Sequence, residues 1–410
     1  MPSVHVTSEI GPLRAVLVHV PGKELLAVTP GTREDYLYDD IIDLQTARQE
    51  HRRLIAVLER FAQVYEVRDL LTTILEQGEV REFLIARMSA FVPEEALKNK
   101  LSGRPAAELA TLLIEGAKAE AGPIGQALNE VGFTLPPVPN LFFTRDVGIV
   151  IGEHVLIGAM RHEVRWSEEL IIKALFRYHP ELRNAGIIYD GSVERRLDHT
   201  LEGGDVHPVR EDTLIVGFSG RSSPAALDQL CEIVFGSTAI TEVIVVVMPG
   251  IPSAIHLDMI FTQVDHELCV VFPPHFIGPG RLPVLYRRKG REGVKEMPDF
   301  FAALQAVNLT LEPILCGGRY RPVQEREQWA SACNFITLRP GVALAYRRNE
   351  ATLAELERAG FEIVDAGSFL AGETTIAADA RAVLTMHGAE LVRGGGGPRC
   401  MTLPVRRDAP

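Results

Sequence analysis

The sequence predicts an α/β protein built as a closed ring of a few ββαβ units, with a helical block inserted near its start. Three observations support this: strand–turn–strand patterns recur in the second half, helical and strand patterns alternate near the start, and the composition changes after about residue 70. The chain has 410 residues, 46% of them hydrophobic and 23% charged. These proportions suit a globular protein that can fill a large core.

The first part of the chain predicts a strand, a helix and a second strand. Residues 13–20 form an apolar run, residues 45–63 carry an apolar stripe at helical spacing, and residues 64–67 form a short strand. From about 70 to 130, Ala, Leu, Glu and Lys dominate. We therefore assign 1–69 and 136–410 to the main α/β body, and 70–135 to an inserted α-helical bundle.

Four copies of one pattern follow, each a polar residue, a strand, a turn and a second strand. Asp146, Asp205, Asp258 and Asn334 open the four copies. In equivalent units these residues would lie at the same strand ends and point toward one axis. The alternative is a set of ordinary strand-entry turns, where Asp and Asn are common. Four copies in the same order favour the ring.

Composition and charge exclude several classes of protein. The net charge of −12 argues against a nucleic-acid binder, which usually carries a basic stripe. No run of about 18 apolar residues predicts a membrane span, and the start of the chain lacks the pattern of a secretory signal. The five cysteines are widely spaced and form no CxxC pair, so neither a disulfide framework nor a zinc module is expected. A reducing cytoplasm is the expected compartment.

A glycine run before a cysteine is the most informative motif. Residues 394–397 are all glycine, and Pro398, Arg399 and Cys400 follow. Glycines let a backbone approach a ligand closely, and an arginine beside a thiol can lower the thiol pKa. The alternative is a flexible tail, but the apolar segment after Cys400 predicts an ordered last strand. No Lys-Ser/Thr pair follows the glycines, which excludes a Walker-type phosphate loop.

The remaining polar motifs predict a site for a planar cation. His256 and Asp258 are two residues apart, so on a strand both would face one site. Glu202 precedes two glycines, and Asp146 follows an Asn-aromatic segment. A cysteine and a histidine without metal-ligand spacing indicate nucleophilic catalysis. Three carboxylates beside them suit a guanidinium, which carboxylates can bind through paired hydrogen bonds.

These motifs resemble the arginine deiminases of the guanidine-modifying, or pentein, superfamily. The resemblance covers essentially the whole chain and rests on motifs in the family's order: Ser8–Leu13, Pro21–Leu25, Phe143–Asp146, Leu201–Asp205, His256–Asp258 and Cys400–Met401. It implies a five-bladed, pseudo-symmetric α/β propeller of ββαβ units with an inserted helical bundle. It also implies hydrolysis of L-arginine to L-citrulline and ammonia through a covalent thiouronium intermediate, with no metal or organic cofactor.

The resemblance assigns roles to individual residues. Cys400 would be the nucleophile, His256 the proton carrier with Glu202 beside it, and Asp146 and Asp258 the clamps on the guanidinium. The residues that would bind the rest of the substrate are Asn140, Phe143, Arg165, Arg221 and Gly394. We expect a homo-oligomer that acts on a small molecule and binds neither nucleic acid nor membrane.

Three positions depart from the family pattern, and several functions stay open. Gly395 and Arg399 replace residues that some members carry as arginine and histidine, and Trp166 lies where a more basic stretch is expected. The alternatives are a hydrolase or amidinotransferase for another guanidine, such as agmatine or a methylated arginine, a catalytically silent arginine-binding pentein, and a metallohydrolase using His256 and the carboxylates. Arg165 and Arg221 argue against agmatine, which has no carboxylate.

Overall fold

Five three-strand arrangements of one kind form the body of the described structure. The structure is a computed structural model and describes residues 4–89, 94–128, 130, 132–183, 186–193 and 198–410. In each arrangement two strands pair antiparallel, and the second of them also pairs in parallel with a third. Because parallel neighbours need a long crossover, helices lie between the second and third strands. The architecture is mixed α/β.

Four arrangements follow one another along the chain, as the repeat predicts. The first contains β5 (Gly148–Ile151), β6 (His154–Ile157), α8 (Trp166–Tyr178) and β7 (Ile187–Asp190). The second contains β8 (Val206–Arg210), β9 (Thr213–Phe218), α9 (Pro224–Ser237) and β10 (Glu242–Val247), and is widened by β13 (Val284–Arg288) and β14 (Lys295–Met297). The third contains β11 (Phe261–Gln263), β12 (Leu268–Val271), α10 (Pro273–Phe276), α11 (Phe300–Ala306) and β15 (Glu312–Leu315). The fourth follows α12 (Arg321–Trp329) and contains β16 (Ile336–Arg339), β17 (Val342–Tyr346), α13 (Glu350–Arg358), β18 (Glu362–Asp365), α14 (Ala366–Ala371) and β19 (Ala382–Met386).

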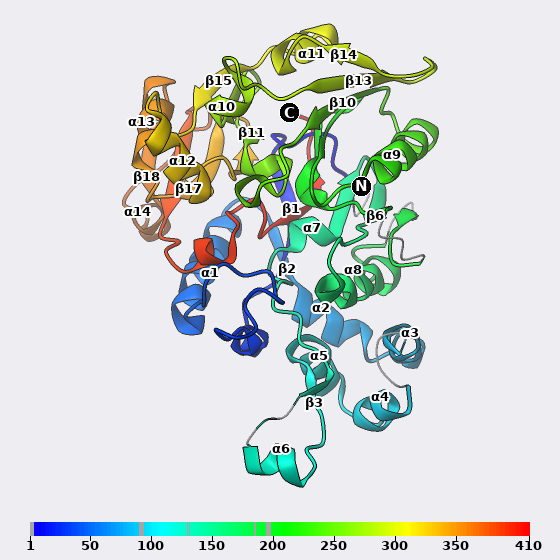
Figure 1. Cartoon of the computed structure of the whole chain (residues 1–410). Helices are drawn as coiled ribbons and strands as arrows, with labels where there is room; N and C mark the ends of the chain where they lie inside the picture. Colours follow the sequence, from blue (N-terminus) through cyan, green and yellow to red (C-terminus); the bar gives the residue numbers. More distant parts are fainter. Residues whose placement is uncertain (1–3, 90–93, 129, 131, 184–185, 194–197) are drawn as a thin grey trace.

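The fifth arrangement joins segments from the two ends of the chain. The central strand β1 (Leu13–Val18) pairs antiparallel with β20 (Leu403–Arg407) and parallel with β2 (Gln63–Glu66), which follows α1 (Leu44–Leu58). The strand, helix and strand predicted for the first residues are therefore confirmed, with the helix ending earlier than expected. The partner β20 is the ordered last strand that the segment after Cys400 predicts. This pairing brings the end of the glycine run into the middle of the molecule (Figure 1).

The segment between β2 and α7 is mainly helical and extends from the lower end of the body in Figure 1. It contains α2 (Val67–Ile74), α3 (Gly78–Met88), α4 (Glu94–Leu101), α5 (Ala106–Glu115), β3 (Ala117–Lys118), α6 (Pro123–Leu128) and β4 (Phe133–Leu135). The hairpin of β3 and β4 was not expected. Apolar residues of α2 and α5, such as Leu71 and Leu113, share one core with Ile171 of α8. The boundary at 70–135 stays a prediction, since this core runs across it.

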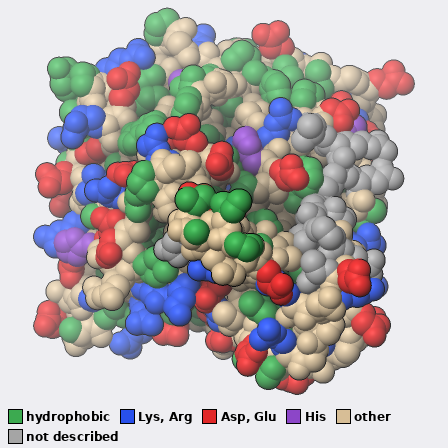
Figure 2. Space-filling model, turned by 60° about the horizontal axis from the view of Figure 1, so that its bottom comes forward, with side chains coloured by type: hydrophobic (Ala, Val, Ile, Leu, Met, Phe, Trp, Pro, Cys, Tyr) green, Lys and Arg blue, Asp and Glu red, His purple; other side chains and the backbone are tan. Residues whose placement is uncertain are grey.

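Short helices connect the larger elements. They are η1 (Lys23–Ala27), α7 (Thr144–Val147), η2 (Glu163–Arg165), η3 (Gly203–Asp205), η4 (Pro252–Ala254), η5 (Leu257–Met259) and η6 (Leu391–Gly394). On the face shown in Figure 2, acidic and basic side chains are interspersed among the described residues. No helix in the described part of the chain has the length and apolar character that a membrane span needs.

Candidate active site

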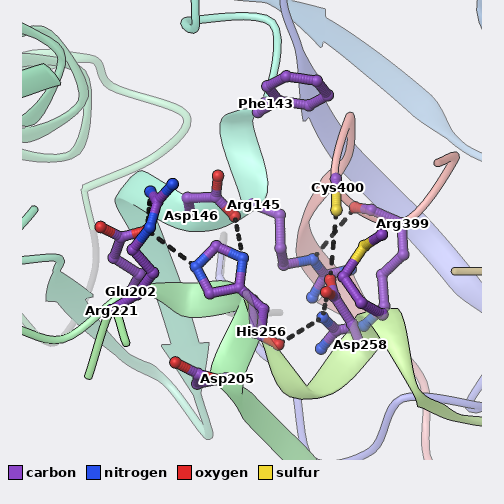
Figure 3. Close-up of polar contacts among 12 residues, drawn as sticks. Phe143, Arg145, Asp146, Glu202, Asp205, Arg221, His256, Asp258, Arg399 and Cys400 are labelled. Carbon is purple, nitrogen blue, oxygen red and sulfur yellow. Dashed lines mark hydrogen bonds and ion pairs between the residues drawn. The ribbon is translucent and has the colours of Figure 1, made fainter. Parts of the chain in front are cut away.

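The polar residues that precede the strands gather in one buried region. Asp146 lies in α7 just before β5, Asp258 lies in η5 before β11, and Cys400 lies in the turn before β20. Glu202 and His256 immediately precede η3 and η5. Figure 3 shows these five side chains converging from separate segments. The fold therefore joins residues that are more than half the chain apart in sequence.

A small cavity lies at the centre of this region. It holds about 30 Å³ of space, enough for about two waters. Most of the predicted site residues line it: Asn140, Phe143, Asp146, Arg165, Arg221, His256, Gly394 and Cys400, together with Leu37, Ile255, Gly395 and Gly396. Glu202 and Asp258 lie directly behind this wall, fully buried and bonded to residues that line it.

The glycine run forms one wall because larger residues would not fit. A Cβ on Gly396 would lie 2.6 Å from the Phe143 ring and 3.1 Å from the Cβ of Cys400. Gly395 has a φ of 85°, in the left-handed region that favours glycine. The run therefore packs its backbone against Phe143 and Cys400, as the motif suggests.

Cys400 is buried among groups that disfavour its charged form. Its Sγ lies 3.5 Å from Oδ2 of Asp258 and accepts a hydrogen bond from Nδ2 of Asn334 at 3.1 Å. Burial, followed by the negative charges of Asp258 and Asp146, raises the pKa of the Cys400 thiol well above its usual value, although the Gly397 amide and Arg399 act in the opposite direction. Arg399 therefore acts in the expected direction, but burial and the carboxylates outweigh it, and the expectation of a low thiol pKa is wrong.

His256 is held between two carboxylates. Its Nε2 lies 2.8 Å from Oε2 of Glu202, and its Nδ1 lies 3.7 Å from Oδ1 of Asp146 (Figure 3). Burial lowers the pKa of His256, but the Asp146 charge and the Glu202 hydrogen bond outweigh it and raise that pKa to about 9. Burial raises the pKa of Glu202, yet Arg221 and His256 lower it to a net value below the usual range. At neutral pH the pair is thus an imidazolium and a carboxylate.

Asp258 is held in place by a buried arginine, Arg399. Arg399 Nη1 donates to Asp258 Oδ2 at 2.8 Å, and Arg399 makes two further bonds to Glu9, from Nε at 3.2 Å and from Nη2 at 3.1 Å. Burial raises the pKa of Asp258, but Arg399 and His256 lower it overall. Asp258 Oδ1 has no hydrogen-bond partner among the described residues. The guanidinium of Arg399 therefore favours the ionised form of Asp258, and Oδ1 of Asp258 keeps no hydrogen-bond partner among the described residues.

Arg165 fills part of the site. Its Nη1 donates to Asp146 Oδ2 at 2.6 Å, while Nε and Nη2 donate to Oε2 of Glu168. Glu168 is fully buried, and burial, opposed by Arg165, raises its pKa to about 7. Asp146 Oδ1 is left without a hydrogen bond in the described structure.

The other predicted binding residues line the same cavity. Arg221 Nη1 lies 3.3 Å from Glu202 Oε2, and Asn140 Nδ2 donates to the Tyr36 carbonyl at 2.9 Å. Asp205 plays a different part: its two oxygens accept hydrogen bonds from Leu257 N, Ser219 Oγ and Ser222 Oγ. These bonds tie η3 to η5 and to the loop after β9.

One local expectation is wrong. His256 and Asp258 do not share a strand, because η5 begins at Leu257 and His256 is the extended residue before it. The two arginines nearby pair with different carboxylates: Arg145 Nη1 lies 3.4 Å from Glu9 Oε1, and Arg165 pairs with Asp146.

One group in the described residues has the spacing of metal ligands. Asp146, Glu202 and His256 each offer an atom, and these atoms lie within 4.8 Å of one another. The Nε2 of His256 is already engaged by Glu202, so a metal would have to displace that hydrogen bond.

Comparison with known proteins supplies the family. The family model for arginine deiminase matches residues 34–407. An arginine deiminase of Listeria welshimeri is 32% identical over 425 residues, covering 99% of each chain. The arginine deiminase of Treponema denticola is 31% identical and covers all of this chain and 99% of its own. The chain belongs to the arginine deiminase family.

Solved structures of low sequence identity share the mixed α/β fold of this arginine deiminase family member. The amidinotransferase SxtG from Microseira wollei is 14% identical, with a TM-score of 0.55 over 100% of this chain and 98% of its own. The N-terminal domain of the cyanobacterial arginine dihydrolase ArgZ, bound to its product, is 15% identical, with a TM-score of 0.53 over 96% and 97%.

Sequence reasoning on this arginine deiminase family chain missed four residues that complete the site. Glu9 and Arg145 support the turn that carries Cys400, Glu168 balances Arg165, and Asn334 contacts the sulfur. Asn334 had a signal, since it opens the fourth repeat. Glu168 had only its position three residues after Arg165 on a helix, which is a common arrangement.

Proposed function

We propose that this chain hydrolyses L-arginine to L-citrulline and ammonia, with Cys400 as the nucleophile. One observation carries the proposal: two carboxylates, each with one buried oxygen that has no hydrogen-bond partner among the described residues, flank a thiol and an imidazolium at a small cavity. A guanidinium supplies the missing donors to Asp146 Oδ1 and Asp258 Oδ1. Family membership supports the same reaction.

The substrate cation activates the nucleophile. Burial and two carboxylates raise the pKa of the Cys400 thiol and favour its protonated form. A bound guanidinium adds a positive charge beside the sulfur, which lowers the thiol pKa, so the thiol proton passes to solvent and returns to the sulfur when the product leaves. The thiolate then attacks the guanidinium carbon and forms the C–S bond of a tetrahedral adduct.

His256 carries protons in both halves of the reaction. The imidazolium protonates the terminal nitrogen, the C–N bond breaks, and ammonia leaves a thiouronium on Cys400. Neutral His256 then takes a proton from water as that water adds to the same carbon. The C–S bond breaks with its electron pair on sulfur, the hydroxyl proton goes to solvent, where ammonia takes it up, and citrulline is released.

Substrate entry requires side chains to move. The cavity of about 30 Å³ is far smaller than an arginine molecule. We propose that Arg165 and Arg221 turn toward the α-carboxylate, with Asn140 beside them, when substrate replaces the Arg165–Asp146 pair. Phe143 then packs on the aliphatic stem and the Gly394 carbonyl accepts the α-amine.

The wider organisation is also part of the proposal. The five repeated arrangements support a five-bladed propeller whose fifth blade joins both ends of the chain. We further propose that 70–135 forms an inserted bundle and that the protein assembles as a homo-oligomer. The five free cysteines are all buried thiols, which supports a reducing compartment such as the cytoplasm.

The decisive experiment measures citrulline and ammonia released from L-arginine, with agmatine and methylarginines in parallel. Equal amounts of both products from arginine, absent in Cys400→Ala, are expected. Turnover of another guanidine in place of arginine would retain the mechanism and change the substrate, with Gly395 and Trp166 as the first positions to examine. Undiminished turnover in Cys400→Ala would overturn the nucleophile assignment, and binding without turnover would favour the arginine-binding alternative.

The spacing of Asp146, Glu202 and His256 makes a metallohydrolase the second candidate. It requires a metal for turnover, whereas thiol attack does not. Activity should survive exhaustive chelation and dialysis. Loss on chelation with recovery on adding Zn²⁺ or Mn²⁺ would favour the metal mechanism.

A further inference from the structure

Asn334 is a buried side chain that the proposed mechanism does not use. It opens the fourth repeat, just before β16, at the position that Asp146 and Asp258 occupy in their own repeats. Only 1% of its surface is exposed. At this position two other repeats carry carboxylates that would bind a guanidinium. Asn334 carries a neutral amide instead, so its role needs another explanation.

The hydrogen bonds of Asn334 fix which way its amide points. Oδ1 accepts from the backbone N–H groups of Gly397 at 3.2 Å and of Cys400 at 3.0 Å. An NH₂ group cannot accept hydrogen bonds, so the oxygen must face these two donors. Nδ2 therefore faces the opposite groups, the Asp258 carbonyl at 3.2 Å and Cys400 Sγ at 3.1 Å.

We propose that Asn334 is a catalytic residue, whose amide donates a hydrogen bond to the Cys400 sulfur and whose carbonyl fixes the glycine run in the reactive position. The inference rests on the proposed role of Cys400 as nucleophile. The donor acts when the sulfur carries negative charge, during attack and again when the C–S bond breaks. A cation at this place would stabilise the thiolate but repel the guanidinium, whereas an amide is a neutral donor.

The charged surroundings show why a neutral donor matters. The titratable groups that act on Cys400 are Asp258 of η5, Asp146 of α7, Tyr346 of β17, and the arginines Arg399 and Arg145. The guanidinium of Arg399 is directed at Asp258 and Glu9, and no hydrogen bond joins it to the sulfur among the described residues. Asn334 is the side-chain N–H donor that the described structure places on Sγ.

Two substitutions separate the donor from general packing. Asn334→Asp keeps shape and the acceptor oxygen but turns an oxygen toward the sulfur. Asn334→Ala removes the donor without adding charge. Asn349→Asp is the matched control, since Asn349 is also buried in the fourth repeat, where its Nδ2 donates to the Ala330 carbonyl at 3.0 Å. Thermal unfolding of each variant shows whether it is folded.

The first readout is turnover of L-arginine. Loss of one preorganised donor to a reacting atom typically lowers kcat by about 10²-fold, so Asn334→Asp should lose at least that much with KM changed by less than about threefold. Asn349→Asp should keep kcat within about threefold of the unsubstituted protein. Equal kcat losses in Asn334→Asp and Asn349→Asp would overturn the proposal.

The second readout does not depend on turnover. Iodoacetamide modification of Cys400, followed by peptide mass spectrometry against pH, reports thiolate formation directly. The half-maximal pH should rise from the unsubstituted protein to Asn334→Ala and again to Asn334→Asp. An unchanged pH profile in both folded variants would refute the donor role. Failure of arginine turnover in the unsubstituted protein, with this order intact, would refute the proposed function alone.

Discussion

At the scale of single residues, the site favours the neutral thiol of the proposed nucleophile, Cys400, and the charged imidazolium of the proposed acid, His256. Burial and carboxylates keep Cys400 neutral, while the same carboxylates keep His256 charged. The nearby carboxylates raise the pKa of both groups, which leaves the thiol neutral and the imidazole charged. A cationic substrate cancels part of that field at the sulfur, so chemistry is coupled to guanidinium binding.

The raised pKa of His256 predicts the alkaline limit of activity. Because ammonia loss needs the imidazolium, kcat should fall as pH rises through about 9. Glu202→Gln removes a charge that raises this pKa, so its alkaline limb should move to lower pH, toward the ordinary value of about 6.5. The measurement is kcat against pH for both proteins, and an unmoved limb in Glu202→Gln would contradict the assignment.

The buried and exposed arginine pairs should differ strongly in their effect on stability. Arg399 is fully buried between Glu9 and Asp258, so Arg399→Ala leaves two buried carboxylates uncompensated and should cost about 3–5 kcal/mol of unfolding free energy. Arg14, half exposed beside Asp408, is the control, and Arg14→Ala should cost less than about 1 kcal/mol. Urea unfolding measures both. Similar losses would show that burial does not govern these pairs.

At the scale of elements, short helices rather than long ones position the chemistry. α7, η3 and η5 each lie just before the first strand of a repeat, so a strand anchors each on one side. Asp205 links η3 to η5 through Leu257 N and to Ser219. A side chain added at these turns should therefore lower kcat more than it lowers the stability of the fold.

Gly204 in η3 tests this point. A Cβ there would lie 2.5 Å from Nδ1 of His256, so Gly204→Ala must move the imidazole, and kcat should fall by more than about 10²-fold. Gly220, in the loop after β9, has no atom within 4 Å of an added Cβ, and Gly220→Ala should keep nearly full activity. Steady-state kinetics on the two variants gives the comparison. Full activity in Gly204→Ala would mean that His256 is not the proton carrier in this position.

At the scale of the whole molecule, pairing of the two ends of the chain carries Cys400 to the centre. β20 pairs with β1, and Arg407 of β20 is buried, donating to the carbonyls of Gly11 at 2.6 Å and Thr337 at 2.7 Å. These bonds join the fifth strand arrangement to β16 of the fourth. The position of Cys400 thus depends on contacts between the two ends of the chain.

Arg407 and its neighbour Arg406 test this closure. Arg407→Ala removes two hydrogen bonds from a charged donor, so it should lower the unfolding free energy by about 2–5 kcal/mol. Arg406 is half-buried, and Arg406→Ala should have a much smaller effect. Denaturant unfolding distinguishes them. Equal effects would show that the ends of the chain are not held by the buried guanidinium.

Local patterns in the sequence determined the class of the fold, its repeats and the chemical identity of the proposed nucleophile, acid and clamps. Strand alternation, helical stripes and polar strand entries act over a few residues, so each can be recognised without the rest of the chain. Only the tertiary structure decided which polar group meets which. Arg399 pairs with Glu9 and Asp258, Asn334 contacts Cys400, and burial raises the thiol pKa, because hydrogen bonding and desolvation depend on distances between segments that are far apart in sequence.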